Sequence, residues 1–179
     1  AVLFGRGGYG TIRIIDKINF NQFYLHPKWL VGYSDITVIH SYIQSQMHIP
    51  TIHGEMCIDL KYGTEDASAM SIKNVLAGKK INYDIPAHPL NRKGKAEGIL
   101  VGGNLSLLTS MLCSSSDINT DRKILFIEDV EEYLYNIDRM MYALLRSGKL
   151  AFLAGLIVGG FTHLKDDDKI PFGQTAYEI

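Results

Sequence analysis

The chain has 179 residues, a length that fits one good-sized domain with a buried core, or one domain and part of another. Hydrophobic residues make up 46% of it and charged residues 21%, as in an ordinary soluble globular protein. The formal net charge of −1 gives no bulk attraction to nucleic acid or to an anionic membrane, and no apolar run approaches the ~20 residues that cross a bilayer.

Short apolar runs alternate with helical patterns through the first half of the chain. Strands are expected at AVLF (residues 1–4), KWLVGY (28–33) and, as a short strand or turn, TIHGEM (51–56). Apolar residues at helical spacing predict helices over 11–23, 35–47 and about 64–77. The first of these helices is expected to bury a stripe formed by Ile12, Ile15 and Ile18.

A polar stretch with two prolines, KKINYDIPAHPLNRKGK, separates the two halves of the chain. It predicts a linker over 79–97, between an N-terminal domain (1–78) and a C-terminal domain (98–179). The strands expected after it are EGILVGG (97–103), KILFIED (123–129) and LAGLIVGGF (153–161). The helices expected between them cover 104–112 and 136–150.

The alternation of short apolar strands with helices indicates an α/β protein with parallel strands. We expect a flavodoxin-like or Rossmann-like N-terminal domain whose first strands are missing, followed by part of a smaller α+β C-terminal domain. The chain begins in mid-strand and stops after the apparent start of a helix, which predicts an interior piece of a longer protein.

Ser34 lies where the strand KWLVGY gives way to a helix, at the sheet edge where α/β proteins bind ligands. A serine at a sharp strand-to-helix turn exposes its hydroxyl, and the N–H of Asp35 points into the same space, as in a nucleophile elbow. The elbow pattern is G-x-S-x-G, whereas this chain has G-Y-S-D-I. The competing interpretation, a helix N-cap, is favoured by this motif alone.

Two further strand ends carry candidate residues. The glycines of GRGGYG (5–10) allow the backbone to approach an anion closely, and they match a dinucleotide fingerprint only loosely because no suitable acidic residue follows. Glu128 ends the strand KILFI, where a carboxylate either caps a turn or orients a histidine as the third member of a triad. No histidine after Glu128 is a convincing candidate for the triad base, because His163 adjoins an acidic run typical of a solvated loop. Among the earlier histidines, His53 is the better-placed candidate.

The two cysteines, Cys57 and Cys113, lie far apart in apolar contexts and lack CxxC spacing. They are interpreted as reduced thiols of an intracellular protein, and we expect no metal site.

Five ordered blocks, RGGYG, GYSDIT, HG, GGNLSLL and FIEDVEEYLYNIDRMM, resemble the LD-carboxypeptidases, a serine peptidase family that also contains the microcin-C-immunity-type hydrolases. The resemblance implies that Ser34 is the nucleophile and Glu128 the triad acid. It also implies that the Asp35 N–H and the turn at Gly7 and Gly8 line the oxyanion hole. Two positions depart from the family pattern: CSSS (113–116) replaces an expected glycine-threonine pair, and Glu131 replaces a small residue.

The resemblance further implies that the triad histidine comes from a G-H segment beyond Ile179. The implied activity is release of terminal D-alanine from murein tetrapeptide during cytoplasmic peptidoglycan recycling, by a homodimer that needs no cofactor. Arg6 is a candidate for binding substrate carboxylates, although it would equally tie its turn to the sheet. The alternatives are a microcin-type hydrolase of aminoacyl nucleotides and, in another class, a non-catalytic anion-binding module in which Ser34 is a cap.

Overall fold

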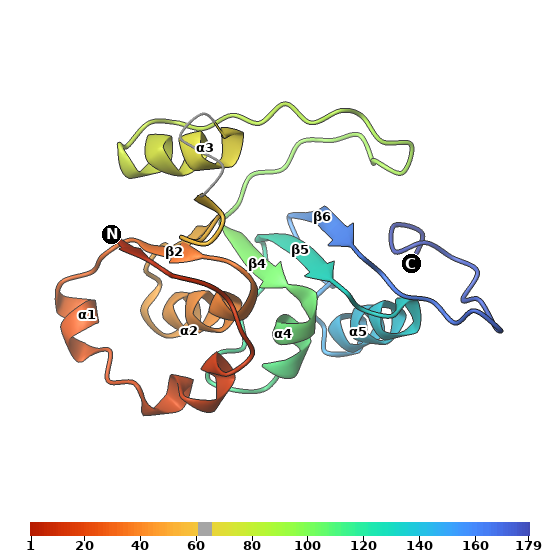
Figure 1. Cartoon of the computed structure of the whole chain (residues 1–179), viewed down its shortest axis with the longest axis horizontal. Coiled ribbons are helices and arrows are strands. Elements are labelled where there is room, and N and C mark those ends of the chain that lie inside the picture. The colour runs from red at the N-terminus through yellow and green to blue at the C-terminus, as the bar shows by residue number, and fades with distance from the viewer. Residues whose placement is uncertain (61–65) are drawn as a thin grey trace. The chain divides into compact units, whose positions relative to one another are not determined.

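Three short parallel strands form the sheet of the first half of the chain. The computed structural model describes residues 1–60 and 66–179, which divide into two compact units, Ala1–His88 and Pro89–Ile179 (Figure 1). In the first unit, β1 (Val2–Leu3), β2 (Leu30–Gly32) and β3 (Ile52–His53) pair in the order β1-β2-β3. The division between the units falls inside the polar segment 79–97.

Helix α2 (Thr37–Met47) supplies much of the core of the first unit. Its residues Val38, Ile39 and Ile43 are buried, as the helical spacing of apolar residues predicts. Helix α3 (Ala67–Leu76) begins at Asp66, whose carboxylate accepts hydrogen bonds from the N–H groups of Ser68 and Ala69. The expected start of this helix near Thr64 lies outside the described residues.

The prediction of one helix over residues 11–23 is wrong. This segment forms two 3₁₀ turns, Thr11–Arg13 and Ile15–Lys17, and a short helix α1 (Asn21–Leu25). The chain is extended at Ile18, and the Asn19 side chain then accepts a hydrogen bond from the Asn21 N–H at 2.9 Å, which starts a new turn. Of the expected apolar stripe, Ile15 is buried, whereas Ile12 and Ile18 are each 36% exposed.

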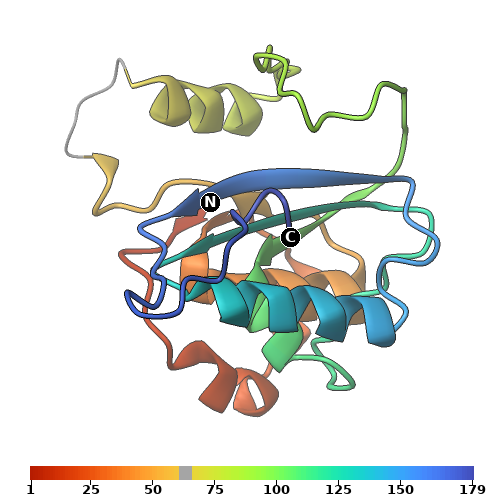
Figure 2. The ribbon, with the colours of Figure 1, turned by 90° about the vertical axis from the view of Figure 1, so that its right-hand side faces the viewer.

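The second unit contains a longer parallel sheet. Strands β4 (Leu100–Asn104), β5 (Ile124–Val130) and β6 (Gly155–Thr162) pair in that order, and all the pairings are parallel. Helices α4 (Leu105–Ser110) and α5 (Leu134–Arg146) connect them, and α5 runs along one face of this sheet (Figure 2). The sequence predicts an α+β domain here, and its described strands continue the α/β alternation of the first unit.

The core of the second unit lies between this sheet and its helices. Its fully buried side chains include Leu105 of α4, Leu125 and Ile127 of β5, and Ile137 of α5. At the β4–β5 contact, Gly102 has φ +136°, and an added Cβ would lie 1.9 Å from the Phe126 carbonyl oxygen. Only glycine therefore permits the two strands to approach at this point.

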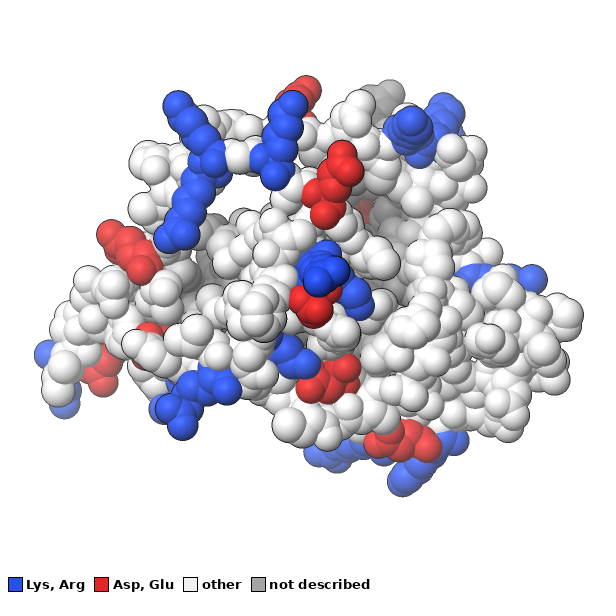
Figure 3. All heavy atoms as spheres, turned by 180° about the vertical axis from the view of Figure 1, so that it is seen from behind, with Lys and Arg blue, Asp and Glu red and all other residues white. Residues whose placement is uncertain are grey.

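The surface carries charges of both signs. Lysine, arginine and acidic side chains share the face drawn in Figure 3, and neither sign covers it alone, which accords with the net charge of −1. Within the described part of the chain, no helix combines the length and apolar character needed to span a membrane.

Candidate active site

Ser34 follows the last residues of β2 in a conformation that is rare for a residue with a side chain. Its φ is +58°, in the left-handed region, whereas the preceding Tyr33 is extended. The chain then enters the 3₁₀ turn Ser34–Ile36 and continues directly into α2. A sharp, strained strand-to-helix turn with a serine at its apex is the geometry of a nucleophile elbow.

The competing N-cap interpretation of Ser34 is wrong. The N-cap residues are Tyr33 for the 3₁₀ turn and Ile36 for α2, and neither makes a side-chain capping hydrogen bond. Gly32 is also required here, because a Cβ on it would lie 2.9 Å from Ile36 Cγ1. Glycine at the strand end thus lets the helical turn fold back tightly and leaves Ser34 at the apex.

The glycine turn packs directly against this serine. A Cβ added to Gly7 would lie 3.1 Å from Ser34 Oγ and 3.2 Å from its Cβ, so a glycine is needed for this close approach. A Cβ on the neighbouring Gly8 would lie 3.5 Å from Asp35 Oδ2. The structure therefore brings together Ser34, Asp35, Gly7 and Gly8, while Arg6 is exposed on the same turn.

The Asp35 side chain is 5% exposed and does not point to solvent. Its Oδ2 accepts hydrogen bonds from the Thr11 hydroxyl at 2.7 Å and from the Thr11 N–H at 3.2 Å. Its Oδ1 is buried and has no hydrogen-bond partner among the described residues. Sequence reasoning assigned a role only to the backbone of this residue, because the partner Thr11 lies 24 positions away.

Two histidines lie near the end of β2: His40 is buried and His53 is half-buried. His40 Nε2 is 2.9 Å from the Gly32 carbonyl oxygen, which also accepts a hydrogen bond from the Gly54 N–H. Burial lowers the pKa of His40, and burial together with the nearby His40 lowers the pKa of His53 to about 4. Both rings are therefore neutral at pH 7, and His40 helps to fix the strand end before Ser34. This role was missed, although a histidine on the buried face of a helix was a signal for it.

Glu128 occupies the carboxyl end of β5 in the second unit. The β5–β6 register is irregular between Ile127 and Asp129, so Glu128 lies at the interruption in the pairing. Its Oε1 is buried without a hydrogen-bond partner in the described part of the chain. Burial, and then the adjacent Asp129, raise the pKa of Glu128 to about 7. A carboxyl perturbed in this way is a candidate functional group that a cationic partner would ionise at neutral pH.

The neighbouring Asp129 has a different environment. It is 3% exposed and accepts hydrogen bonds from Asn104 Nδ2 at 2.8 Å and from the Ser106 N–H at 2.9 Å. Asn104 is itself the N-cap of α4, through its bond from the Leu107 N–H. Asp129 thus fixes the start of α4 to the end of β5, a structural role that the acidic run in the sequence did not reveal.

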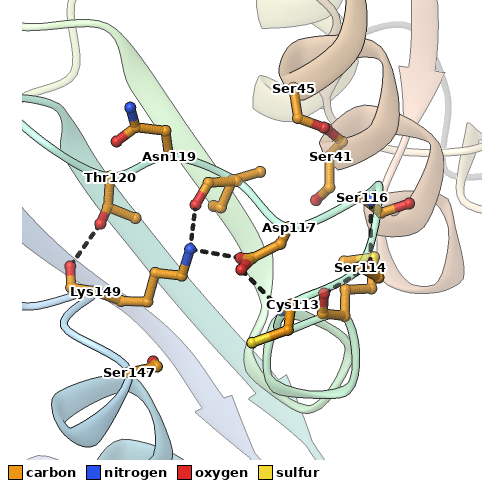
Figure 4. Close-up of polar contacts among 12 residues, drawn as sticks. Ser41, Ser45, Cys113, Ser114, Ser116, Asp117, Asn119, Thr120, Ser147 and Lys149 are labelled. Carbon is orange, nitrogen blue, oxygen red and sulfur yellow. Dashed lines mark hydrogen bonds and ion pairs between the residues drawn. The ribbon is translucent and has the colours of Figure 1, made fainter.

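A polar hollow of about 250 Å³ lies at the other end of the second sheet, before β5 and β6 begin. Lys149 borders it, forms an ion pair with Asp117 at 2.6 Å and donates a hydrogen bond to the Ile118 carbonyl oxygen (Figure 4). The Thr120 hydroxyl bonds the Lys149 carbonyl oxygen in turn. These contacts join the two turns that precede the strands.

No group of three or more potential metal ligands occurs in residues 1–60 and 66–179.

The fold defines an α/β protein with a glycine turn packed on a strand-to-helix serine. Family models agree: the LD-carboxypeptidase N-terminal domain matches residues 1–54, and the LD-carboxypeptidase C-terminal domain matches residues 97–178. The chain belongs to the LD-carboxypeptidase family, which confirms the resemblance drawn from the five sequence blocks.

Relatives with curated names are similar along most of the chain. A probable murein peptide carboxypeptidase of Bacillus subtilis is 43% identical over 166 residues, covering 90% of this chain and 52% of that protein. The murein tetrapeptide carboxypeptidase of Pseudomonas aeruginosa is 31% identical over 169 residues, covering 88% and 54%. The chain therefore spans about half the length of these relatives.

Solved structures share the fold. The muramoyltetrapeptide carboxypeptidase from Oxalobacter formigenes has a TM-score of 0.73 at 27% identity, covering 94% of this chain and 58% of that one. The microcin C7 self-immunity protein MccF has a TM-score of 0.77 at 19% identity, covering 97% and 60%. The first supports family membership, whereas the second shows the α/β fold alone.

Proposed function

We propose that the longer protein containing this chain is a serine LD-carboxypeptidase that releases the terminal D-alanine of murein tetrapeptide. The observation that carries the proposal is the left-handed Ser34 at a strand-to-helix turn, with Gly7 pressed against its hydroxyl. The names of the Bacillus and Pseudomonas relatives support the substrate class. In this proposal Ser34 is the nucleophile and Glu128 the triad acid.

The proposed reaction needs a histidine base, which we assign to the part of the protein beyond Ile179. The imidazole takes the Ser34 proton while Oγ attacks the carbonyl carbon between an L-configured centre and D-alanine. The resulting oxyanion is bound by the Asp35 N–H and by N–H groups of the turn at Gly7 and Gly8. The imidazolium then protonates the leaving nitrogen, D-alanine departs, and water activated by the imidazole hydrolyses the acyl-serine and regenerates Oγ–H.

Glu128 has a specific part in this scheme. Its pKa, raised to about 7, means that a substantial share of its carboxyl is protonated at neutral pH when it lacks a cationic partner. An imidazolium beside it would favour the carboxylate, and the carboxylate would in turn stabilise the imidazolium formed during the attack. The buried and unpaired Oε1 supplies an acceptor for the ring N–H.

A microcin-type immunity hydrolase would use the same triad on an aminoacyl nucleotide. The likeness to MccF, at 19% identity, extends to the fold only, whereas the 43% identity to a murein peptide carboxypeptidase favours the peptide substrate. A non-catalytic anion-binding module is the other alternative, and it does not account for the left-handed conformation of Ser34. We further propose that the enzyme works in the cytoplasm as a homodimer, which fractionation and sedimentation would test.

The test is release of D-alanine from murein tetrapeptide by the longer protein, with murein tripeptide and an aminoacyl sulfamoyl nucleotide as alternative substrates. Ser34→Ala is expected to abolish release while leaving the fold intact, because an apical hydroxyl contributes little to packing. Ser106→Ala is the matched control, since the bond that Ser106 gives to Asp129 comes from its backbone N–H. Turnover retained by Ser34→Ala would rule out the nucleophile assignment.

A further inference from the structure

We propose that the Asp35 carboxylate and Thr11 are positioning residues that hold the glycine turn 5–10 against Ser34. This inference rests on the proposed function, in which that turn lines the oxyanion hole. The Asp35 N–H is the candidate oxyanion donor, and this inference gives the Asp35 carboxylate a separate task. One residue then fixes both sides of the hole.

The two ends of the glycine turn are fastened in different ways. At its start, the Phe4 N–H bonds the Val31 carbonyl oxygen of β2, and the carbonyl oxygens of Phe4 and Gly5 accept bonds from the N–H groups of Cys57 and Ile58. At its end, Thr11 is the first residue after Gly10, and its N–H and hydroxyl both donate to Asp35 Oδ2. The start is therefore held by backbone groups of β2 and of the turn after β3, and the end by the Asp35 side chain.

The two hydrogen bonds from Thr11 to Asp35 Oδ2 are expected to be strong. Asp35 is 5% exposed, so water competes little for its Oδ2, and hydrogen bonds to a charged acceptor are about twice as strong as neutral ones. Two donors of one residue on one oxygen also fix the direction of the chain as it leaves the turn. The same carboxylate oxygen lies 3.5 Å from the position of a Cβ on Gly8, so the tie is adjacent to the turn it holds.

The other carboxylate oxygen argues against a purely stabilising role. Asp35 Oδ1 is buried without a hydrogen-bond partner among the described residues, and a buried acceptor that lacks a partner destabilises the folded state. A side chain selected for stability alone would satisfy both oxygens or be apolar. Such local violations are expected where function sets the geometry, and here the left-handed Ser34 stands directly before Asp35.

The test uses the longer protein with Thr11→Val, Thr11→Ser, Asp35→Asn and the Thr11→Val/Asp35→Asn double variant. Thr11→Val removes the hydroxyl donor at nearly constant size. We expect kcat for D-alanine release to fall about tenfold with KM within about twofold, because a misplaced turn weakens binding of the transition state more than that of the substrate. Thr11→Ser keeps the hydroxyl and should restore kcat to within about twofold.

The double variant tests whether the Thr11 and Asp35 side chains affect kcat through each other or independently. If the two side chains act through each other, adding Thr11→Val to Asp35→Asn should lower kcat by less than about twofold further. Ser45→Ala is the matched control, because it removes a hydroxyl that donates to the Ser41 carbonyl oxygen near the other end of α2, and it should leave kcat unchanged. Labelling of Ser34 by a fluorophosphonate should slow in parallel with kcat, which excludes an effect confined to the peptide substrate.

The outcomes distinguish the two proposals. Thr11→Val with an unchanged kcat, or effects of Thr11→Val and Asp35→Asn that multiply in the double variant, would overturn the positioning role. Thr11→Val that loses activity only in proportion to folded protein, measured by its melting curve, would overturn it too. If Ser34→Ala keeps full turnover, it is the proposed function that fails.

Discussion

At the residue scale, the contribution of the close contact between Gly7 and Ser34 can be tested separately from that of the other glycines in the turn. Gly7→Ala places a methyl group 3.1 Å from Ser34 Oγ and 3.2 Å from its Cβ, a contact tight enough to displace the serine by a few tenths of an ångström. We expect kcat for D-alanine release by the longer protein to fall about tenfold or more, because the attack depends on alignment of Oγ.

Gly10→Ala is the control for Gly7→Ala. Nothing lies within 4 Å of a Cβ at Gly10, although it belongs to the same turn. Gly10→Ala should therefore keep kcat within about twofold and change the melting temperature little. Equal losses from the two variants would mean that the turn needs flexibility at both positions, and the contact with Ser34 would not be the cause.

A substitution at Glu128 can likewise separate the structural role of this side chain from its role in catalysis. Glu128→Gln keeps the size and hydrogen-bonding capacity of the side chain but removes the charge that stabilises an imidazolium. Loss of the acid in the serine protease triad lowers kcat by about 10⁴-fold, so we expect a fall of at least about a hundredfold here. Because burial disfavours the Glu128 carboxylate, the melting temperature should change little or rise.

The nearby acidic residues supply controls for Glu128→Gln. Glu132 Oε2 accepts a hydrogen bond from Asn136 Nδ2 at the start of α5, and Glu131 is exposed. Glu131→Gln and Glu132→Gln should each keep most of the activity. Equal effects from all three substitutions would mean that the acidic run acts as a charged surface, which would remove Glu128 from the triad.

Two residues that depart from the family pattern share one backbone feature. Cys113 and Glu131 have φ values of +61° and +62°, in the region that glycine adopts most easily. Their positions are where the family resemblance leads us to expect a glycine-threonine pair and a small residue. The pattern was visible in the sequence, but its cause, a left-handed turn at each site, required the backbone.

At the scale of elements, strands were easier to predict than the segment after the glycine turn. The apolar runs around Leu30–Gly32 and Ile124–Val130 are bounded by turn residues, and both form strands. The run at 11–23 has helical spacing, but it ends locally through the Asn19 side chain and buries only Ile15 of its stripe. Periodicity describes one helix face and does not register such competing local bonds.

The candidate site could be predicted only in part for a related reason. Ser34 and Gly7 follow strands and Glu128 lies near the end of one, so the order of elements along the chain predicts all three at the ends of sheets. The Asp35–Thr11 bond, the His40 contact with Gly32 and the bonds from Asn104 and Ser106 to Asp129 join residues through side-chain directions that no spacing rule gives. Long-range polar contacts of this kind depend on the packed fold.

The glycine pair of β4 gives a prediction at this scale. Gly102→Ala combines an unfavourable φ of +136° with a Cβ only 1.9 Å from the Phe126 carbonyl oxygen, so β4 and β5 would have to separate. We expect a loss of roughly 3 kcal/mol or more in the free energy of unfolding of the longer protein, measured by denaturant titration. Gly160→Ala in β6 is the control.

A Cβ at Gly160 meets nothing closer than Thr162 Cγ2 at 3.8 Å, an ordinary contact. Gly160→Ala should therefore change the free energy of unfolding by less than about 1 kcal/mol. A Gly102→Ala variant as stable as Gly160→Ala would show that the β4–β5 pairing is looser than its register indicates.

At the scale of the whole molecule, the proposed mechanism concerns a protein about twice as long as this chain, if its length is like that of the named relatives. Strand β6 forms one edge of the second sheet, and its Leu156, Ile157 and Val158 are each more than 40% exposed. Exposed apolar residues on a sheet edge favour association with other chains. We therefore expect the 179-residue chain, expressed alone, to be poorly soluble.

The same isolated chain tests where the catalytic base lies. Of its six histidines, the buried His40 and the half-buried His53 have lowered pKa values, and His163 follows β6 with a φ of +52°. If the base lies beyond Ile179, the chain alone should release no D-alanine from murein tetrapeptide, and His163→Gln in the longer protein should leave kcat within about twofold. The measurement is D-alanine release by equal amounts of soluble, folded protein, with the Ser34→Ala variant as the blank. Activity of the isolated chain that disappears on His53→Gln or His163→Gln would place the base within these residues, and the triad would then have to be reassigned.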